Sequence, residues 1–200
     1  LWDVWAGRKP LEWYRTAFHR FVSEFGFQSF PEPRTVRCYT TADDHNVTSP
    51  VMEHHQRVSG GVGNTVIIQY MLDGFRFPRG FEMTLWLSQI LQSMAIQSAV
   101  EHWRRNRPRC MGALYWQLND VWPGASWSSI DVDGGWKALQ FRARHFYAPV
   151  RVVPLRRDGR TAVFLVSDRT TPLAAQLRTR VLDVNGTTVS DTTRAVTLPP

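Results

Sequence analysis

Glu24 is the acidic side chain whose position in this sequence is most suggestive of chemistry. It lies near the end of residues 20–26 (Arg-Phe-Val-Ser-Glu-Phe-Gly), a segment typical of a short buried strand that ends in a glycine turn. Burying an unpaired carboxylate costs several kcal/mol, so such a group needs hydrogen-bond donors or a working role. Parallel α/β barrels gather their active sites at the carboxyl ends of strands. Glu24 is therefore a structural or a catalytic carboxylate by position alone.

A second cluster combines aromatic and polar side chains at residues 115–122 (Tyr-Trp-Gln-Leu-Asn-Asp-Val-Trp). Sugar rings present apolar C–H faces and a rim of hydroxyls, so a sugar site needs an aromatic platform with amide and carboxylate partners. Trp116, Asn119 and Asp120 offer those groups. Packing is the alternative reading, since some of the nine tryptophans must belong to the core, and for Trp122 packing is the favoured reading.

The elements that must position these residues follow from hydrophobic patterning. Residues 10–19 open on a proline and have a helical pattern, residues 111–118 form an apolar run of strand length, and residues 136–146 predict a helix. We expect loops with short helices over 34–80, including a flexible glycine-rich loop at 60–65. The order strand, loop, helix, strand, loop, helix suits parallel strands in an α/β barrel or a doubly wound sheet.

Residues 81–105 have the clearest periodicity in the chain and predict an amphipathic helix. Apolar side chains recur at helical spacing beside three glutamines. We expect the stripe from Met83 to Met94 to belong to the core. The apolar residues are Leu87, Ile90, Leu91 and Met94, and the glutamines are Gln89, Gln92 and Gln97.

After Pro149 the sequence pattern becomes typical of β-strands. Residues 152–153, 163–166 and 177–184 are strand candidates, and the dipeptides at 158–159 (Asp-Gly) and 185–186 (Asn-Gly) favour hairpins. Two domains are predicted, 1–149 and 150–200. About four strands are too few for a sandwich of about seven, so we expect the second domain to continue beyond residue 200.

Composition excludes several classes of protein. The net charge of +7 comes almost entirely from scattered arginines, which form no basic stripe, so nucleic-acid binding is not expected. No apolar run approaches the roughly 20 residues of a membrane-spanning helix. Cys38 and Cys110 match no metal or redox spacing, and His54-His55 lacks a third ligand at a zinc-like spacing. No metal or cofactor is expected, and the oligomeric state is left open.

Longer motifs resemble a known family. Residues 23–31 (Ser-Glu-Phe-Gly-Phe-Gln-Ser-Phe-Pro) and 111–123 (Met-Gly-Ala-Leu-Tyr-Trp-Gln-Leu-Asn-Asp-Val-Trp-Pro) closely resemble β-mannosidases of glycoside hydrolase family two. Shorter stretches at 125–127, 136–137 and 146–149 are also similar to that family, and the resemblance covers about residues 1–150. It implies the C-terminal part of a TIM (β/α)8 barrel, whose seventh strand ends at Glu24 and whose eighth lies near 112–118. The start of an immunoglobulin-like β-sandwich follows.

The resemblance also implies roles for single residues. Glu24 corresponds to the family's nucleophile and Trp116 lines its sugar subsite, whereas Asn119 and Asp120 either contact sugar or shape their loop. Trp5 is a further substrate-binding candidate, although Ala6 stands where related bacterial sequences often have histidine. A retaining glycosidase needs two carboxyl groups roughly 5–5.5 Å apart. The family's acid/base lies in an Asn-Glu pair, which this sequence lacks, so we expect the proton donor in upstream sequence and an inactive isolated fragment.

The function implied is hydrolysis of terminal β-D-mannosyl residues from oligosaccharides or glycoconjugates. Two alternatives remain: a related exo-glycosidase such as an exo-β-glucosaminidase, and a non-catalytic carbohydrate-binding module. An oligosaccharide is the expected partner in each case. The compartment is open among bacterial cytoplasm, periplasm and secretion.

Overall fold

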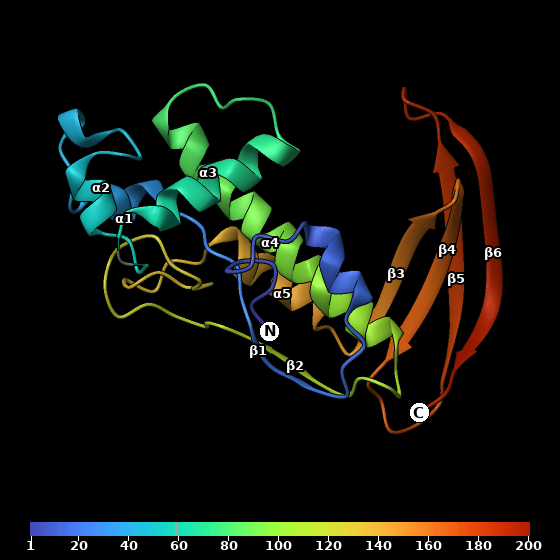
Figure 1. Ribbon diagram of the computed structural model, residues 1–200. Coiled ribbons are helices and arrows are strands. Elements are labelled where there is room, and N and C mark those ends of the chain that lie inside the picture. Colours follow the sequence, from blue (N-terminus) through green and yellow to red (C-terminus); the bar gives the residue numbers. More distant parts are fainter. Residues whose placement is uncertain (59) are drawn as a thin grey trace. The chain divides into compact units, whose positions relative to one another are not determined.

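The computed structural model describes residues 1–58 and 60–200, which divide into two units, Leu1–Tyr147 and Ala148–Pro200. The first unit mixes helices with a short parallel strand pair, and the second contains antiparallel strands (Figure 1). In chain order the first unit contains η1 (Leu11–Thr16), β1 (Val22–Phe25), α1 (Pro33–Arg37), η2 (Ala42–Asp44), α2 (Pro50–His54), α3 (Val62–Gly74), α4 (Phe81–Arg105), β2 (Ala113–Tyr115) and α5 (Ala138–Phe146).

Strands β1 and β2 pair in parallel, as the order of predicted elements suggested. Val22 lies opposite Ala113 and Phe25 opposite Tyr115. Both strands are shorter than the predicted segments 20–26 and 111–118. Because the strands run in the same direction, Glu24 and Trp116 arrive at the same end of the pair.

Helix α3 corrects the prediction for residues 34–80. That region was expected to hold loops and short helices, but α3 is 13 residues long and begins at Val62, inside the stretch expected to be a flexible loop. Gly60 and Gly61 have φ values of 86° and 71°, a left-handed conformation that glycine adopts without steric cost. The two glycines therefore form the turn that leads into the helix. The predicted helix at 10–19 is likewise a shorter 3-10 helix, η1.

Helix α4 has the predicted bounds, but its buried face is only in part the predicted one: Leu91 is buried and Leu87 packs against the core. Met83, Ile90 and Met94 are exposed in this chain, whereas Gln89 and Gln92 are completely buried. Gln92 Nε2 donates to the carbonyl oxygens of Phe27 and Ser128 at 2.9 and 3.1 Å. Gln89 Oε1 accepts from the amide of Ala138 at 3.1 Å. Both glutamines therefore bond backbone groups of segments packed on the helix, which a hydrophobic pattern does not reveal.

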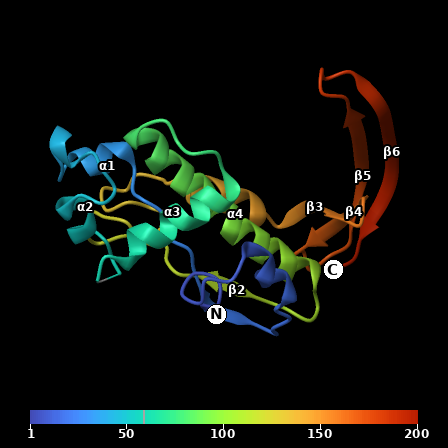
Figure 2. The same cartoon turned by 45° about the horizontal axis from the view of Figure 1, so that its top comes forward.

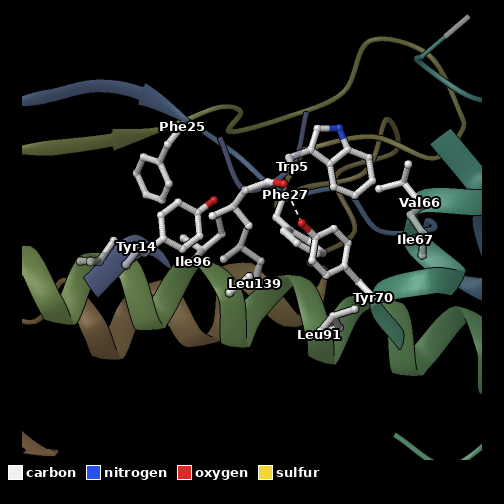
Figure 3. Close-up of a cluster of buried hydrophobic side chains, with 14 of the residues drawn as sticks. Trp5, Tyr14, Phe25, Phe27, Val66, Ile67, Tyr70, Leu91, Ile96 and Leu139 are labelled. Carbon is white, nitrogen blue, oxygen red and sulfur yellow. Dashed lines mark hydrogen bonds between the residues drawn. The ribbon is translucent and has the colours of Figure 1, made fainter. Parts of the chain in front are cut away.

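Helices α3 and α5 pack against α4, which runs through the unit (Figures 1 and 2). The core above α4 is strongly aromatic, and Figure 3 shows two groups of rings, one around Tyr14 and Phe25 and the other around Trp5, Phe27 and Tyr70. The hydroxyl of Tyr70 donates to the backbone, with the carbonyl oxygen of Val4 at 2.6 Å. The N-terminal segment that precedes η1 is thereby fixed to α3.

The second unit consists of two antiparallel hairpins. Strand β3 (Val150–Arg157) pairs with β4 (Arg160–Ser167), and β5 (Leu173–Leu182) pairs with β6 (Thr188–Leu198). The turns fall at the Asp-Gly and Asn-Gly dipeptides, as predicted, with Gly159 and Gly186 at φ 74° and 86°.

No helix within the described ranges combines the length and apolarity that a membrane span requires.

Trp103 is the side chain whose loss should weaken the first unit most clearly. It is 1% exposed, it meets Phe25 edge to face at 4.7 Å, and its indole N–H donates to the Ala17 carbonyl at 2.9 Å. Trp103→Ala is expected to lower the free energy of unfolding by about 3–5 kcal/mol, because it leaves a large cavity. Urea denaturation of the full-length protein measures this loss. Phe77→Ala is the control, since Phe77 is 78% exposed, and an equal effect of both changes would contradict the assignment.

Candidate active site

A cavity of about 420 Å³ lies at the shared end of β1 and β2. Its lining combines one carboxylate, one guanidinium and several indole rings with an aliphatic wall, two valines of which come from α3. The lining residues are Trp2, Trp5, Ala6, Arg8, Glu24, Val58, Val62, Val66, Trp116 and Trp127. Three of the five predicted site residues, Glu24, Trp116 and Trp5, are thus brought together, and Asn119 and Asp120 lie outside the lining.

Glu24 lies on β1 with its side chain on the exposed side of the strand. The burial pattern of the strand is irregular, with Val22 and Phe25 buried and the two residues between them, Ser23 and Glu24, exposed, so the expectation of a buried strand is wrong. Phe25 packs in the core, whereas Glu24 lines the cavity. The indole N–H of Trp2 donates to Glu24 Oε1 at 2.8 Å. The carboxylate is consequently held by one defined donor at the cavity wall.

Trp116 follows β2 directly and is 45% exposed. Its backbone N–H donates to the carbonyl oxygen of Phe25 at 2.7 Å, and the peptide bond that follows it is cis. The backbone is fixed to the neighbouring strand while the ring remains accessible from the cavity. This arrangement offers a flat apolar surface of the kind on which sugar rings pack.

Trp5 lines the cavity, but most of its ring packs against other aromatic side chains. It is 5% exposed, meets Phe27 edge to face at 5.1 Å and stacks on Tyr70 at 6.5 Å (Figure 3). Little of its ring therefore remains for a ligand. Ala6 also lines the cavity, so the position expected to carry histidine in related sequences contributes only a methyl group here.

Sequence reasoning missed two of the lining indoles as site residues, Trp2 and Trp127. Their rings meet edge to face at 5.9 Å. Trp127 lay in one of the motifs that carried the family resemblance, but no role was inferred for it. Trp2 stands in no motif. The amide of Ala6 donates to the carbonyl of Trp2 at 2.9 Å, and the resulting turn places Trp2 and Trp5 at one cavity.

Asp120 is buried in the loop that follows Trp116, where it shapes the backbone. Its Oδ2 accepts hydrogen bonds from the hydroxyls of Ser126 and Ser128, both at 2.5 Å, and its Oδ1 accepts one from Gln117 Nε2 at 3.3 Å. Asn119 is exposed, and its amide donates to the Asp120 carbonyl at 3.3 Å. These contacts favour the loop-shaping alternative for both residues.

Lys137 brings a positive charge to the interior beside this loop. Its side chain is completely buried, and burial lowers the pKa of its ammonium group against the opposing effect of nearby Asp131, Asp120 and Glu32. Burial also raises the pKa of the Asp131 carboxyl group, although its Oδ2 accepts from the Glu32 amide at 2.8 Å and from Thr35 Oγ1 at 3.0 Å. Buried charges of opposite sign offset part of each other's desolvation cost.

The histidine pair takes part in packing. His55 stacks between Tyr39 at 3.9 Å and Trp122 at 4.7 Å, and its Nδ1 lies 2.7 Å from the Pro123 carbonyl oxygen. The ring stack fits the packing role favoured for Trp122. Across residues 1–58 and 60–200 no group of three or more metal-binding side chains comes together.

The sequence of this chain is similar to those of known β-mannosidases. The chain is 36% identical to the β-mannosidase of Bos taurus over 159 residues, which is 73% of this chain and 18% of that protein. It therefore spans less than a fifth of the length of this relative. No protein-family model matches the chain.

Solved structures agree over nearly the whole chain. The β-D-mannosidase of Dictyoglomus thermophilum has a TM-score of 0.85 and 29% identity, covering 99% of this chain and 25% of that one. The exo-chitosanase of Amycolatopsis orientalis, in complex with PNP-β-D-glucosamine, has a TM-score of 0.80, covering 96% of this chain and 24% of that one. At 15% identity this second likeness concerns the fold alone.

Gly26 provides the sharpest test of how the cavity is assembled. A Cβ atom there would lie 2.5 Å from the carbonyl oxygen of Trp116, 2.9 Å from the Trp2 ring and 3.0 Å from the Trp127 ring. Gly26→Ala must displace these groups, and we expect a loss of about 1–3 kcal/mol in the free energy of unfolding. Tryptophan fluorescence should change as well. Gly74→Ala is the control, because a Cβ there meets nothing within 4 Å; unchanged stability and fluorescence in Gly26→Ala would contradict the packing described.

Proposed function

Because this chain is homologous to part of the β-mannosidases, we propose that it supplies the nucleophile side of a retaining glycoside hydrolase that removes terminal β-D-mannosyl residues from oligosaccharides or glycoconjugates. The observation that carries the proposal is the position of Glu24. Its carboxylate lines a cavity of about 420 Å³ beside four indole rings and accepts a hydrogen bond from one of them. The cavity has the size of a small-ligand site and joins apolar surface to a single carboxylate.

The proposed architecture follows the same homology. Residues 1–149 form the C-terminal part of a TIM barrel, in which β1 and β2 are neighbouring parallel strands, and residues 150–200 begin an immunoglobulin-like sandwich. The parallel pairing of β1 with β2 supports the barrel, and the two antiparallel hairpins support the sandwich. Active sites of such barrels lie at the carboxyl ends of the strands, which is where Glu24 and Trp116 meet.

In the proposed reaction Glu24 attacks the anomeric carbon of the bound sugar. A bond forms between a carboxylate oxygen and this carbon while the bond to the leaving oxygen breaks, and a second carboxyl group protonates that oxygen. Water then attacks the same carbon and gives its proton to the second carboxylate, which frees Glu24 and retains the configuration. The second carboxyl group is assigned to a part of the protein outside this chain.

The indoles are proposed to orient the sugar and the nucleophile. Trp116 presents its accessible ring to the C–H face of the sugar. Trp5 forms another part of the cavity wall. The Trp2 N–H directs one carboxylate oxygen, leaving the other free to attack. Asn119 and Asp120 act on the loop that follows Trp116, as their hydrogen bonds within that loop support.

Replacing the proposed nucleophile tests the catalytic role. Glu24→Gln keeps the size of the side chain but removes the charge, so turnover of an aryl β-mannoside by the full-length protein should fall at least about 10³-fold. Sugar binding measured by calorimetry should persist. Glu12→Gln makes the same chemical change at an exposed position of η1 and should leave turnover unchanged. Near-normal turnover of Glu24→Gln would exclude the proposed nucleophile.

Sugar preference separates the mannosidase from its nearest alternative. We expect kcat/KM for p-nitrophenyl β-D-mannoside to exceed that for the β-D-glucosaminide and β-D-glucoside by at least about tenfold, the scale of one lost hydrogen bond. Preference for the glucosaminide would identify the exo-glucosaminidase alternative. Binding of sugar by the full-length protein without turnover of any of the three would identify a carbohydrate-binding module.

A further inference from the structure

Asp120 accepts hydrogen bonds from the two residues that flank Trp127, which lines the cavity. The hydroxyls of Ser126 and Ser128 both donate to its Oδ2, and Trp127 lies between these serines. The backbone supports the same geometry, because the Gln117 amide donates to the Trp127 carbonyl at 3.1 Å. The position of the Trp127 backbone is therefore tied to one buried carboxylate.

Trp127 in turn contacts the donor of the candidate nucleophile. Its ring meets Trp2 edge to face at 5.9 Å, and the Trp2 N–H donates to Glu24 at 2.8 Å. A continuous series of contacts thus runs from Asp120 through the serines and the two indoles to Glu24. Edge-to-face packing fixes the ring plane of Trp2, and this plane decides where its N–H points.

Asp120 is itself fixed in this loop. It is 5% exposed, its backbone amide donates to the Ile130 carbonyl at 3.0 Å, and its Oδ1 accepts from Gln117 Nε2 at 3.3 Å. Because a buried carboxylate requires such partners, the hydrogen bonds from Ser126 and Ser128 complete a fixed arrangement of the loop.

We propose that Asp120 is a positioning residue for catalysis, which holds Trp127 through Ser126 and Ser128 so that Trp2 directs its N–H at Glu24. The inference rests on the proposed function, since it requires Glu24 to be the nucleophile. Asp120 lies outside the cavity lining. Its effect reaches the reaction through two indoles, and it should alter how fast the bound sugar reacts more than how tightly it binds.

A double-mutant cycle tests this coupling in the full-length protein. Trp2→Phe removes the donor and should lower kcat by about tenfold to a hundredfold, the effect of one hydrogen bond to a charged group, while KM changes less than about threefold. Ser126→Ala combined with Ser128→Ala, and separately Asp120→Asn, should lower kcat in the same direction. Because all act through one donor, Trp2→Phe should have little further effect in either background.

Controls separate positioning from folding. Urea denaturation establishes that each variant is fully folded in the assay, and Ser190→Ala, an exposed serine of β6, should leave kcat unchanged. The serine variants keep the test open should Asp120→Asn fail to fold.

The outcomes are distinct. Additive effects of Trp2→Phe and the serine changes, or an unchanged kcat in the folded serine variants, would overturn the inference. Turnover retained by Glu24→Gln would overturn the proposed function itself, whereas loss of turnover in Glu24→Gln with an additive cycle would overturn the positioning role alone.

Discussion

The close approach of β1 and β2 at their carboxyl ends is the constraint on which the site depends. The Trp116 amide donates to the Phe25 carbonyl at 2.7 Å, and Gly26 leaves room for the Trp116 carbonyl and two indole rings where any side chain would collide. A parallel pair brings residues far apart in sequence to one edge. Here it joins a carboxylate from one segment to an aromatic surface from another, and the cavity is formed by what surrounds that junction.

Around this junction the protein uses aromatic rings for two purposes. Rings such as Trp103 and Tyr14 are buried and fill the core, whereas Trp116 keeps an accessible face. Trp2 and Trp127 lie between these extremes, since they pack against each other and also line the cavity. The core and the site are therefore continuous.

Site residues that stand in a recognisable motif could be predicted from the sequence. Residues that reach the cavity only through the path of the backbone could not. Glu24 and Trp116 stand in long motifs at strand ends, so both position and chemistry indicated them. Trp2 carries no motif, and only the turn that joins it to Ala6 reveals its role. Asp120 is polar in a polar loop, and a sequence cannot distinguish a carboxylate that contacts ligand from one that accepts hydrogen bonds from its own loop. In the fold, the bounds of α4 followed from periodicity, but α3 was missed because its opening glycines indicate a loop.

The buried glutamines of α4 restrict how the sequence of this region can evolve. Gln92 donates to the carbonyls of Phe27 and Ser128 and accepts from the Ser29 hydroxyl at 2.9 Å, so one side chain serves two segments distant in sequence. An insertion or deletion between residues 117 and 131 would move the Ser128 carbonyl out of reach and leave polar groups without partners in the interior. Loop length in this stretch is therefore constrained by a helix that contributes no side chain to the cavity lining, and variation around Trp127, the lining residue of this stretch, must proceed by substitution at fixed length.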